Sequence, residues 1–127
     1  MLKANSTIKL NMSRINKICE AKITALEKTA EALKTDIIQE QVIPFDTGAL
    51  QNESTFVDYS HSSSGKVSLI HATPYARRLY YHPEFKFQKT ENPNAKGRWL
   101  EDWEEGGSKE DVAREKYARF LKQEADL

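Results

Sequence analysis

The sequence predicts one α+β domain: a long N-terminal amphipathic helix packed on a small antiparallel β-sheet, then a short helix, a long arm-like loop and a C-terminal helix. Three observations lead to this class. An apolar stripe with helical spacing covers about residues 13–42, two runs of strand-forming residues lie between about 50 and 71, and a proline- and asparagine-rich stretch covers 82–97. A chain of 127 residues is one domain's worth of sequence.

The long helix is predicted from apolar residues that recur every three or four positions, which places them on one helix face. These residues are Met12, Ile15, Cys19, Ile23, Leu26, Ala30, Leu33 and Ile37. Pro44 is expected to end the helix. A helix of about 29 residues would be over about 40 Å long, so we expect most of the stripe to cover the chain's own sheet and one end to meet another subunit. Cys19 is expected to be a small core residue.

The segment about 50–71 is predicted to form a β-hairpin, because two strand-like runs flank the turn Ser62-Ser63-Ser64-Gly65. An earlier short strand is predicted at 7–10, where polar and apolar residues alternate. Thr73 is predicted to cap a short helix over 74–81, with Pro74 at its first position.

The stretch 82–97 is predicted to be an arm loop, since loops this long are usually functional or disordered. Phe85 and Phe87 alternate with charged residues there, which is compatible with a short hairpin arm. The C-terminal helical region, about 98–125, is predicted to include a last helix capped by Ser108, with final residues that fray.

Net charge is zero but unevenly distributed. Residues 74–99 carry 6 basic and 2 acidic side chains, whereas 100–127 carry 5 basic and 9 acidic ones. Such segments could meet within a subunit or head to tail between copies, and a head-to-tail contact that closes makes a ring; solvated charges are the simpler interpretation. No apolar run approaches the ~20 residues that cross a bilayer, so no membrane partner is expected. We also expect no signal peptide.

The sequence contains few residues or motifs typical of a catalytic, metal or cofactor site. The single cysteine excludes an internal disulfide, and the three histidines lack zinc-ligand spacing, so no metal or cofactor is predicted. The chain is expected not to be an enzyme, because no nucleotide-binding or hydrolase motif occurs. The carboxylates of 101–105 could in principle do acid–base work, but an ion-paired face is the more common arrangement. The basic 77–98 segment leaves a nucleic-acid-binding module as an alternative function.

Two blocks, IPFDTGALQNES and ATPYARRLYYHPEFKFQKTENPNAKGRWLEDW, resemble the minor capsid and tail-completion proteins of siphophages infecting Gram-positive bacteria. The shared pattern is a Pro-x-Asp-Thr-Gly-x-Leu turn, a Pro-Tyr-Ala-Arg segment, an aromatic pair, Asn-Pro and a final tryptophan. Residues 42–103 carry the match, and the acidic C-terminal helix departs from it.

The resemblance implies a virion protein of the head–tail interface, assembled in the host bacterial cytoplasm. Copies would form a ring, expected to be hexameric, around the DNA channel, with a stopper or connector on the head side, the tail terminator on the tail side, and non-specific proximity to genomic DNA. The loop 82–97 would reach a neighbouring ring, and we expect the subunit to fold without residues 84–96.

Three groups of residues are expected to serve this role. The turn between helix and sheet would use Pro44, Asp46, Thr47, Gly48 and Leu50. The short helix would pack through Pro74, Tyr75, Ala76 and Tyr80. Contacts between subunits or rings would use Arg77, Arg78, Phe85, Phe87, Asn92, Pro93, Arg98, Trp99 and Trp103.

Overall fold

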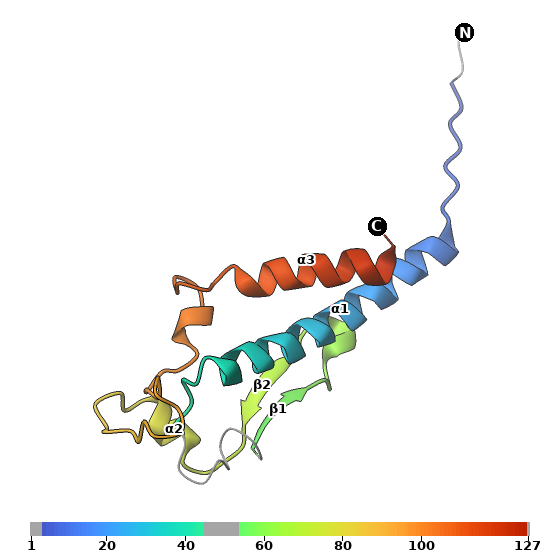
Figure 1. Ribbon diagram of the computed structural model, residues 1–127. Coiled ribbons are helices and arrows are strands. Elements are labelled where there is room, and N and C mark those ends of the chain that lie inside the picture. Colours follow the sequence, from blue (N-terminus) through green and yellow to red (C-terminus); the bar gives the residue numbers. More distant parts are fainter. Residues whose placement is uncertain (1–3, 45–53, 127) are drawn as a thin grey trace.

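Helix α1 (Met12–Gln39) is the middle layer of the protein in the computed structural model, which describes residues 4–44 and 54–126. Helix α3 (Val112–Ala125) lies along one side of α1. A hairpin of strands β1 (Thr55–Asp58) and β2 (Ser68–His71) lies on the other side (Figure 1). The predicted α+β class is therefore confirmed, with the long helix enclosed between two layers and not only laid on a sheet.

Helix α1 begins where the side chain of Asn11 accepts a hydrogen bond from the Arg14 backbone N–H at 3.0 Å. It ends at Gln39, earlier than the predicted 42, because Gln41 adopts a left-handed conformation with φ of 58°. The early end has a packing reason. Val42 and Ile43 leave the helix and turn into the core, where Ile43 is 0% exposed.

Helix α3 packs antiparallel to α1 over a strip of small residues. Ala21 and Ala25 are buried on α1, and Ala125 is buried on α3, so the two backbones can approach closely. Ion pairs run along this contact: Lys17 with Asp126, Lys28 with Glu124, and Asp36 with Lys116. The prediction that the last residues fray is wrong for the described ones, because Ala125 is buried and Asp126 is paired with Lys17.

The hairpin is confirmed. Its strands pair antiparallel with Thr55 opposite His71 and Val57 opposite Leu69, and a 3-10 turn η2 (Ser62–Ser64) joins them. Alternation puts Val57 toward the interior and leaves Phe56 exposed. The strand predicted at 7–10 is wrong: among the described residues it has no ladder partner.

The hydrophobic core lies beside the C-terminal end of α1. It contains Ile37, Val42, Ile43, Ala76 and Trp99, with partly buried residues around them: Ile38, Leu69, Leu79, Tyr80, Leu100 and Trp103. Trp99 is 1% exposed and packs edge-on against Tyr80 at 4.8 Å between ring centroids. Its indole N–H donates to Nε2 of His71 at 3.1 Å, which satisfies a buried donor.

Two predicted helix starts are wrong. The short helix α2 is Ala76–Tyr80, and Thr73 does not cap it: the Thr73 carbonyl accepts from the Ala76 N–H at 3.2 Å, while its hydroxyl has no partner among the described residues. Ser108 does not cap α3. The chain first forms the 3-10 turn η3 (Glu101–Trp103) and a tight turn in which the Lys109 N–H donates to the Asp102 carbonyl at 2.7 Å.

Acid should weaken this core through His71. Trp99 donates to Nε2, so Nε2 carries no proton, and Nδ1 lies 2.8 Å from the Thr55 hydroxyl. Burial lowers the pKa of His71 below its ordinary value of 6.5. Because the folded state disfavours the charged ring, this stability is complete above pH 6.5 and is lost as pH falls through the folded pKa.

We therefore expect the urea midpoint of unfolding to be lower at about pH 5 than at about pH 7.5. His71→Gln, whose side chain cannot be protonated in this range, should reduce the difference between the two midpoints. His61→Gln at an exposed position should preserve it. An equal pH response in all three proteins would contradict the assignment.

Candidate interaction surface

The end of the molecule where α1 stops also contains α2, the loop 82–98 and η3 (Figure 1). The structure brings most of the predicted contact residues to this end, but it divides them by exposure. Arg77, Arg78, Pro93 and Arg98 are exposed; Phe85, Phe87 and Trp103 are partly buried; Asn92 and Trp99 are buried.

The prediction that Trp99 and Asn92 contact another subunit is wrong. Trp99 fills the centre of the core, between α2 and β2. Asn92 is buried because its side-chain N–H donates to the Ile43 carbonyl at 2.8 Å. Both residues hold the chain's own fold, so neither is accessible to a neighbour.

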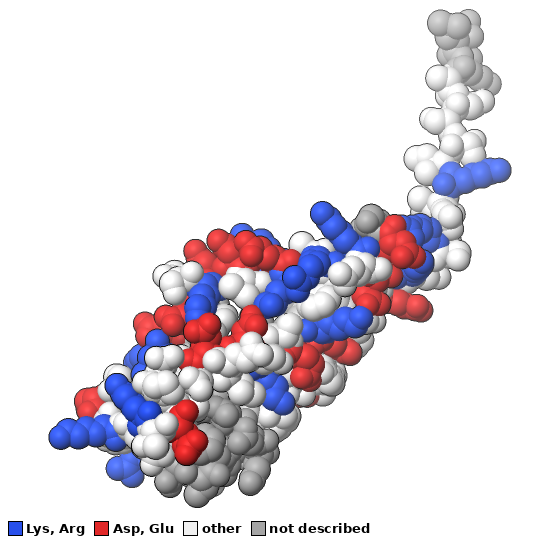
Figure 2. Space-filling model, in the orientation of Figure 1, with Lys and Arg blue, Asp and Glu red and all other residues white. Residues whose placement is uncertain are grey.

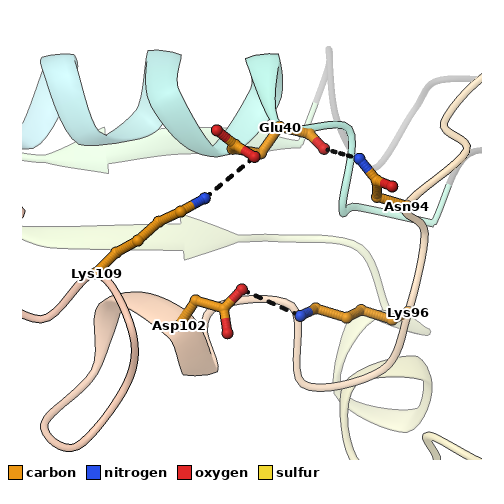
Figure 3. Close-up of polar contacts among 5 residues, drawn as sticks. All are labelled: Glu40, Asn94, Lys96, Asp102 and Lys109. Atoms are coloured by element: carbon orange, nitrogen blue, oxygen red, sulfur yellow. Dashed lines mark hydrogen bonds and ion pairs between the residues drawn. The ribbon is translucent and has the colours of Figure 1, made fainter.

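The segment 92–97 closes the open end of α1. The last carbonyls of a helix lack partners within the helix and must find donors elsewhere. Here the Asn94 side chain donates to the Glu40 carbonyl at 2.9 Å (Figure 3), and the Lys96 N–H donates to the Val42 carbonyl at 3.1 Å. With Asn92 on Ile43, donors from this one segment serve carbonyls of three neighbouring residues.

Two ion pairs hold the surrounding elements to the same place. Lys109, which precedes α3, lies 3.1 Å from the Glu40 carboxylate, and Lys96 lies 3.2 Å from the carboxylate of Asp102 in η3 (Figure 3). All four groups are partly exposed, so each pair contributes at most about 1 kcal/mol. Their effect is to fix the position of the segment 92–97 relative to α1 and η3.

The predicted arm loop therefore consists of two parts, and within the described residues 82–97 no strand forms. Residues 92–97 are anchored, and residues 82–91 are largely exposed. The two ends of the loop approach closely, since a Cβ placed on Gly97 would lie 2.6 Å from Cα of Pro83. The structure argues against the expectation that the subunit folds without residues 84–96, because their deletion would remove the buried residues Asn92 and Ala95.

The exposed part, 82–91, is ordered by local contacts. The His82 ring stacks on the Phe85 ring with 4.8 Å between their centroids, and the Arg78 guanidinium also lies over Phe85, 5.6 Å from its centroid. A hydrogen bond from His82 at 2.8 Å lowers the pKa of Glu84. Aromatic and charged groups thus form a compact tip and not an extended hairpin.

Two of the carboxylates at 101–105 have partners within the chain. Asp102 is paired with Lys96, and Glu104 accepts a hydrogen bond from the Tyr80 hydroxyl at 3.1 Å. Burial and this contact raise the pKa of Tyr80 to about 12. Within 4–44 and 54–126, no group of His, Cys, Asp or Glu is arranged to hold a metal ion.

Between α2 and η3 lies an open cleft of about 500 Å³, lined by Arg77, Tyr80, Tyr81 and Glu104 among others. Tyr81 is exposed and lies 5.4 Å from the Arg98 guanidinium. The cleft combines aromatic faces with charges of both signs. That mixture suits contact with another protein.

The other expected groups have mixed outcomes. Asp46, Thr47, Gly48 and Leu50 lie outside the described residues, while Pro44 is described and buried. In the short helix Ala76 is buried and Tyr80 packs on Trp99. The expectation that Pro74 and Tyr75 pack there is wrong: both are exposed, because the chain turns around Ala76 and directs Leu79 and Tyr80 inward.

A second exposed region lies at the start of α1, which is the end of the apolar stripe that the chain's own layers leave uncovered. Cys19, expected in the core, is exposed, as are Met12 and Ile15 on the same stripe. The spacing that revealed the stripe carries no information about which part of it α3 and the hairpin cover.

A scan against protein-family models and searches of curated proteins and of solved structures found no match to this chain. Among the helices described, none combines the length and the hydropathy that crossing a membrane requires.

Asn92→Ala should destabilise the protein by about 1–3 kcal/mol, because it removes a buried donor and leaves the Ile43 carbonyl without that partner. The matched control is Asn94→Ala, whose exposed hydrogen bond to Glu40 should be worth about 1 kcal/mol or less. Urea unfolding measures both. If both variants lowered the free energy of unfolding equally, the buried Asn92 side chain would not be what fixes the segment 92–97.

Proposed function

We propose that this chain is a non-enzymatic structural subunit of the neck of a tailed bacteriophage. Copies form a ring, hexameric in this proposal, which joins the DNA-filled head to the tail and surrounds the DNA channel. The partners are a stopper or connector on the head side and a tail terminator on the tail side. Assembly takes place in the cytoplasm of the host bacterium.

The observation that carries the proposal is that the two sequence blocks behind the phage resemblance contact each other in the fold. Ile43 comes from the first block, and Asn92 and Trp99 come from the second. Asn92 donates to Ile43, and Ile43 and Trp99 belong to one core cluster. The described parts of both blocks thus meet in one core, which supports a shared architecture; Asp46, Thr47, Gly48 and Leu50 of the first block lie outside the described residues.

Exposed apolar and aromatic side chains also support a subunit that works beside copies of itself. Such residues occur on the N-terminal segment 4–11, on α1, on the hairpin and at the two ends of α2: Ile8, Leu10, Met12, Ile15, Phe56, Tyr59, Tyr75 and Tyr81. Surface apolar groups gathered in patches mark sites of protein contact. We assign the tip 82–91 to contact with the neighbouring ring, because it is exposed yet internally ordered.

A nucleic-acid-binding module is the second candidate, favoured by one observation. Five exposed basic side chains belong to α2 and the following loop: Arg77, Arg78, Lys86, Lys89 and Arg98. Figure 2 shows Lys and Arg projecting from this end of the molecule. In the neck proposal the same charges need only tolerate DNA nearby, and they are held partly by aromatic rings, as Arg78 is by Phe85.

Replacing residues 84–91 by an equally long Gly/Ser segment should leave the subunit folded, because its core contacts lie outside this range. Particles carrying the variant should show heads and tails that fail to join. Thermal unfolding checks the fold, and electron microscopy of lysates checks the joining. A control variant, Lys66→Ala at an exposed hairpin position, should assemble normally. Normal virions from the Gly/Ser variant would refute the role given to the tip.

The two candidates differ in DNA affinity. If the basic side chains bind DNA, affinity for a labelled duplex should fall roughly several hundred-fold between about 50 and 200 mM salt, given five phosphate contacts. Arg77→Glu with Arg78→Glu should then abolish binding. The neck proposal predicts weak or no binding by the isolated subunit at either salt concentration. Fluorescence polarisation decides between them.

A further inference from the structure

The N-terminal segment 4–11 leads away from the rest of the protein (Figure 1). We call it the N-terminal arm. Its apolar side chains are the most exposed of the described chain's large hydrophobic residues, with Ile8 83% and Leu10 67% exposed. Residues two apart lie on the same side of an extended chain, so Ile8 and Leu10 together give the arm one apolar edge.

A groove with matching chemistry lies on α1. It has a volume of about 560 Å³ and is lined by Cys19, Ile23 and Leu26 of α1, by Tyr117 of α3 and by the hairpin turn 62–65. We call it the α1 groove. Most of its lining surface is apolar. An apolar surface of this kind is covered in the working assembly of many proteins.

The fold explains why this groove is open. Helix α1 is a single helix between two layers, so α3 and the hairpin cover two of its faces and leave its sides uncovered. The apolar stripe lies on one such side. Towards its C-terminal end Ala30 and Ile37 are buried, whereas Cys19, Ile23 and Leu26 in its middle line the groove.

We propose that the N-terminal arm of one copy binds in the α1 groove of the next copy, with Ile8 and Leu10 as its anchors. This deepens the proposed ring and rests on it. The arm's eight residues span about 26 Å when extended at about 3.3 Å per residue, enough to cross to a neighbour. The groove volume is within the range of about 300–1,000 Å³ that holds small groups of side chains or ligands.

The geometry favours a neighbour's groove over the chain's own. The arm joins α1 at Asn11, whose capping hydrogen bond fixes the first turn, and it continues away from both α3 and the hairpin. To reach its own groove the chain would have to reverse at this cap. Arm and groove are different surfaces of the subunit, so the contact is heterologous and can propagate from copy to copy until a ring closes.

Disulfide trapping tests the proposal in the full-length chain. Cys19 is the only cysteine and lines the groove, so Ile8→Cys supplies a second thiol at the proposed anchor. On mild oxidation with copper phenanthroline we expect a ladder of crosslinked dimers, trimers and larger species on a non-reducing gel. Ile8→Cys combined with Cys19→Ser should lose the larger species, and Lys89→Cys, at the far end of the molecule, should not form the ladder.

Three results would overturn the inference. They are an intrachain disulfide alone, crosslinked dimers without larger species, and no product above the Lys89→Cys control. Leu10→Asp added to Ile8→Cys gives a second readout: it should strongly reduce crosslinking with unchanged circular dichroism, because both positions are exposed. If the Leu10→Asp variant crosslinked as strongly as Ile8→Cys alone, the arm would not be the anchor.

The inference and the proposed function can fail separately. A neck ring seen in particles of an arm variant, Ile8→Asp with Leu10→Asp, would overturn the arm contact and leave the neck role standing. If the purified protein formed the crosslinked ladder but was absent from phage particles, the arm contact would stand and the neck role would fall.

Discussion

The carbonyl groups at the end of α1 are the constraint on which this fold depends. Because Gln41 turns the chain out of the helix, the carbonyls of Glu40, Val42 and Ile43 lose helical partners next to a buried core. Segment 92–97 supplies the missing donors. Satisfying them brings Trp99 into the core, and Trp99 in turn contacts α2 and β2. One local requirement thus joins the helix, the hairpin and the loop.

What the sequence could predict was decided by local physics. The spacing of apolar residues on α1 and the serine-rich turn of the hairpin are properties of neighbouring residues, and both predictions are confirmed. The roles of Asn92 and Trp99 depend on partners about fifty residues away, such as Ile43, and no local pattern encodes them. Cys19 shows the same limit: its spacing placed it on the correct face, but α3 and the hairpin leave that part of the face open.

The proposed arm contact would be weak by itself. Burying Ile8 and Leu10 would contribute about 1.5–3 kcal/mol each, whereas bringing two proteins together costs about 4–15 kcal/mol. A pair of subunits would therefore dissociate readily, and only a closed ring, or a platform that gathers subunits at high local concentration, would hold them. In this proposal, subunits would stay dispersed until such a platform gathers them.

The approach of Gly97 to Pro83 has a consequence for how such a protein can diverge. The two residues close the base of the loop, so residues 84–91 form a cassette joined to the scaffold at a single narrow point. Insertions or replacements within 84–91 would leave the anchoring hydrogen bonds of residues 92–96 in place. Natural variants could therefore change their binding partner by changing residues 84–91 alone. Gly97 itself has no such freedom, since any side chain there would collide with the opposite wall.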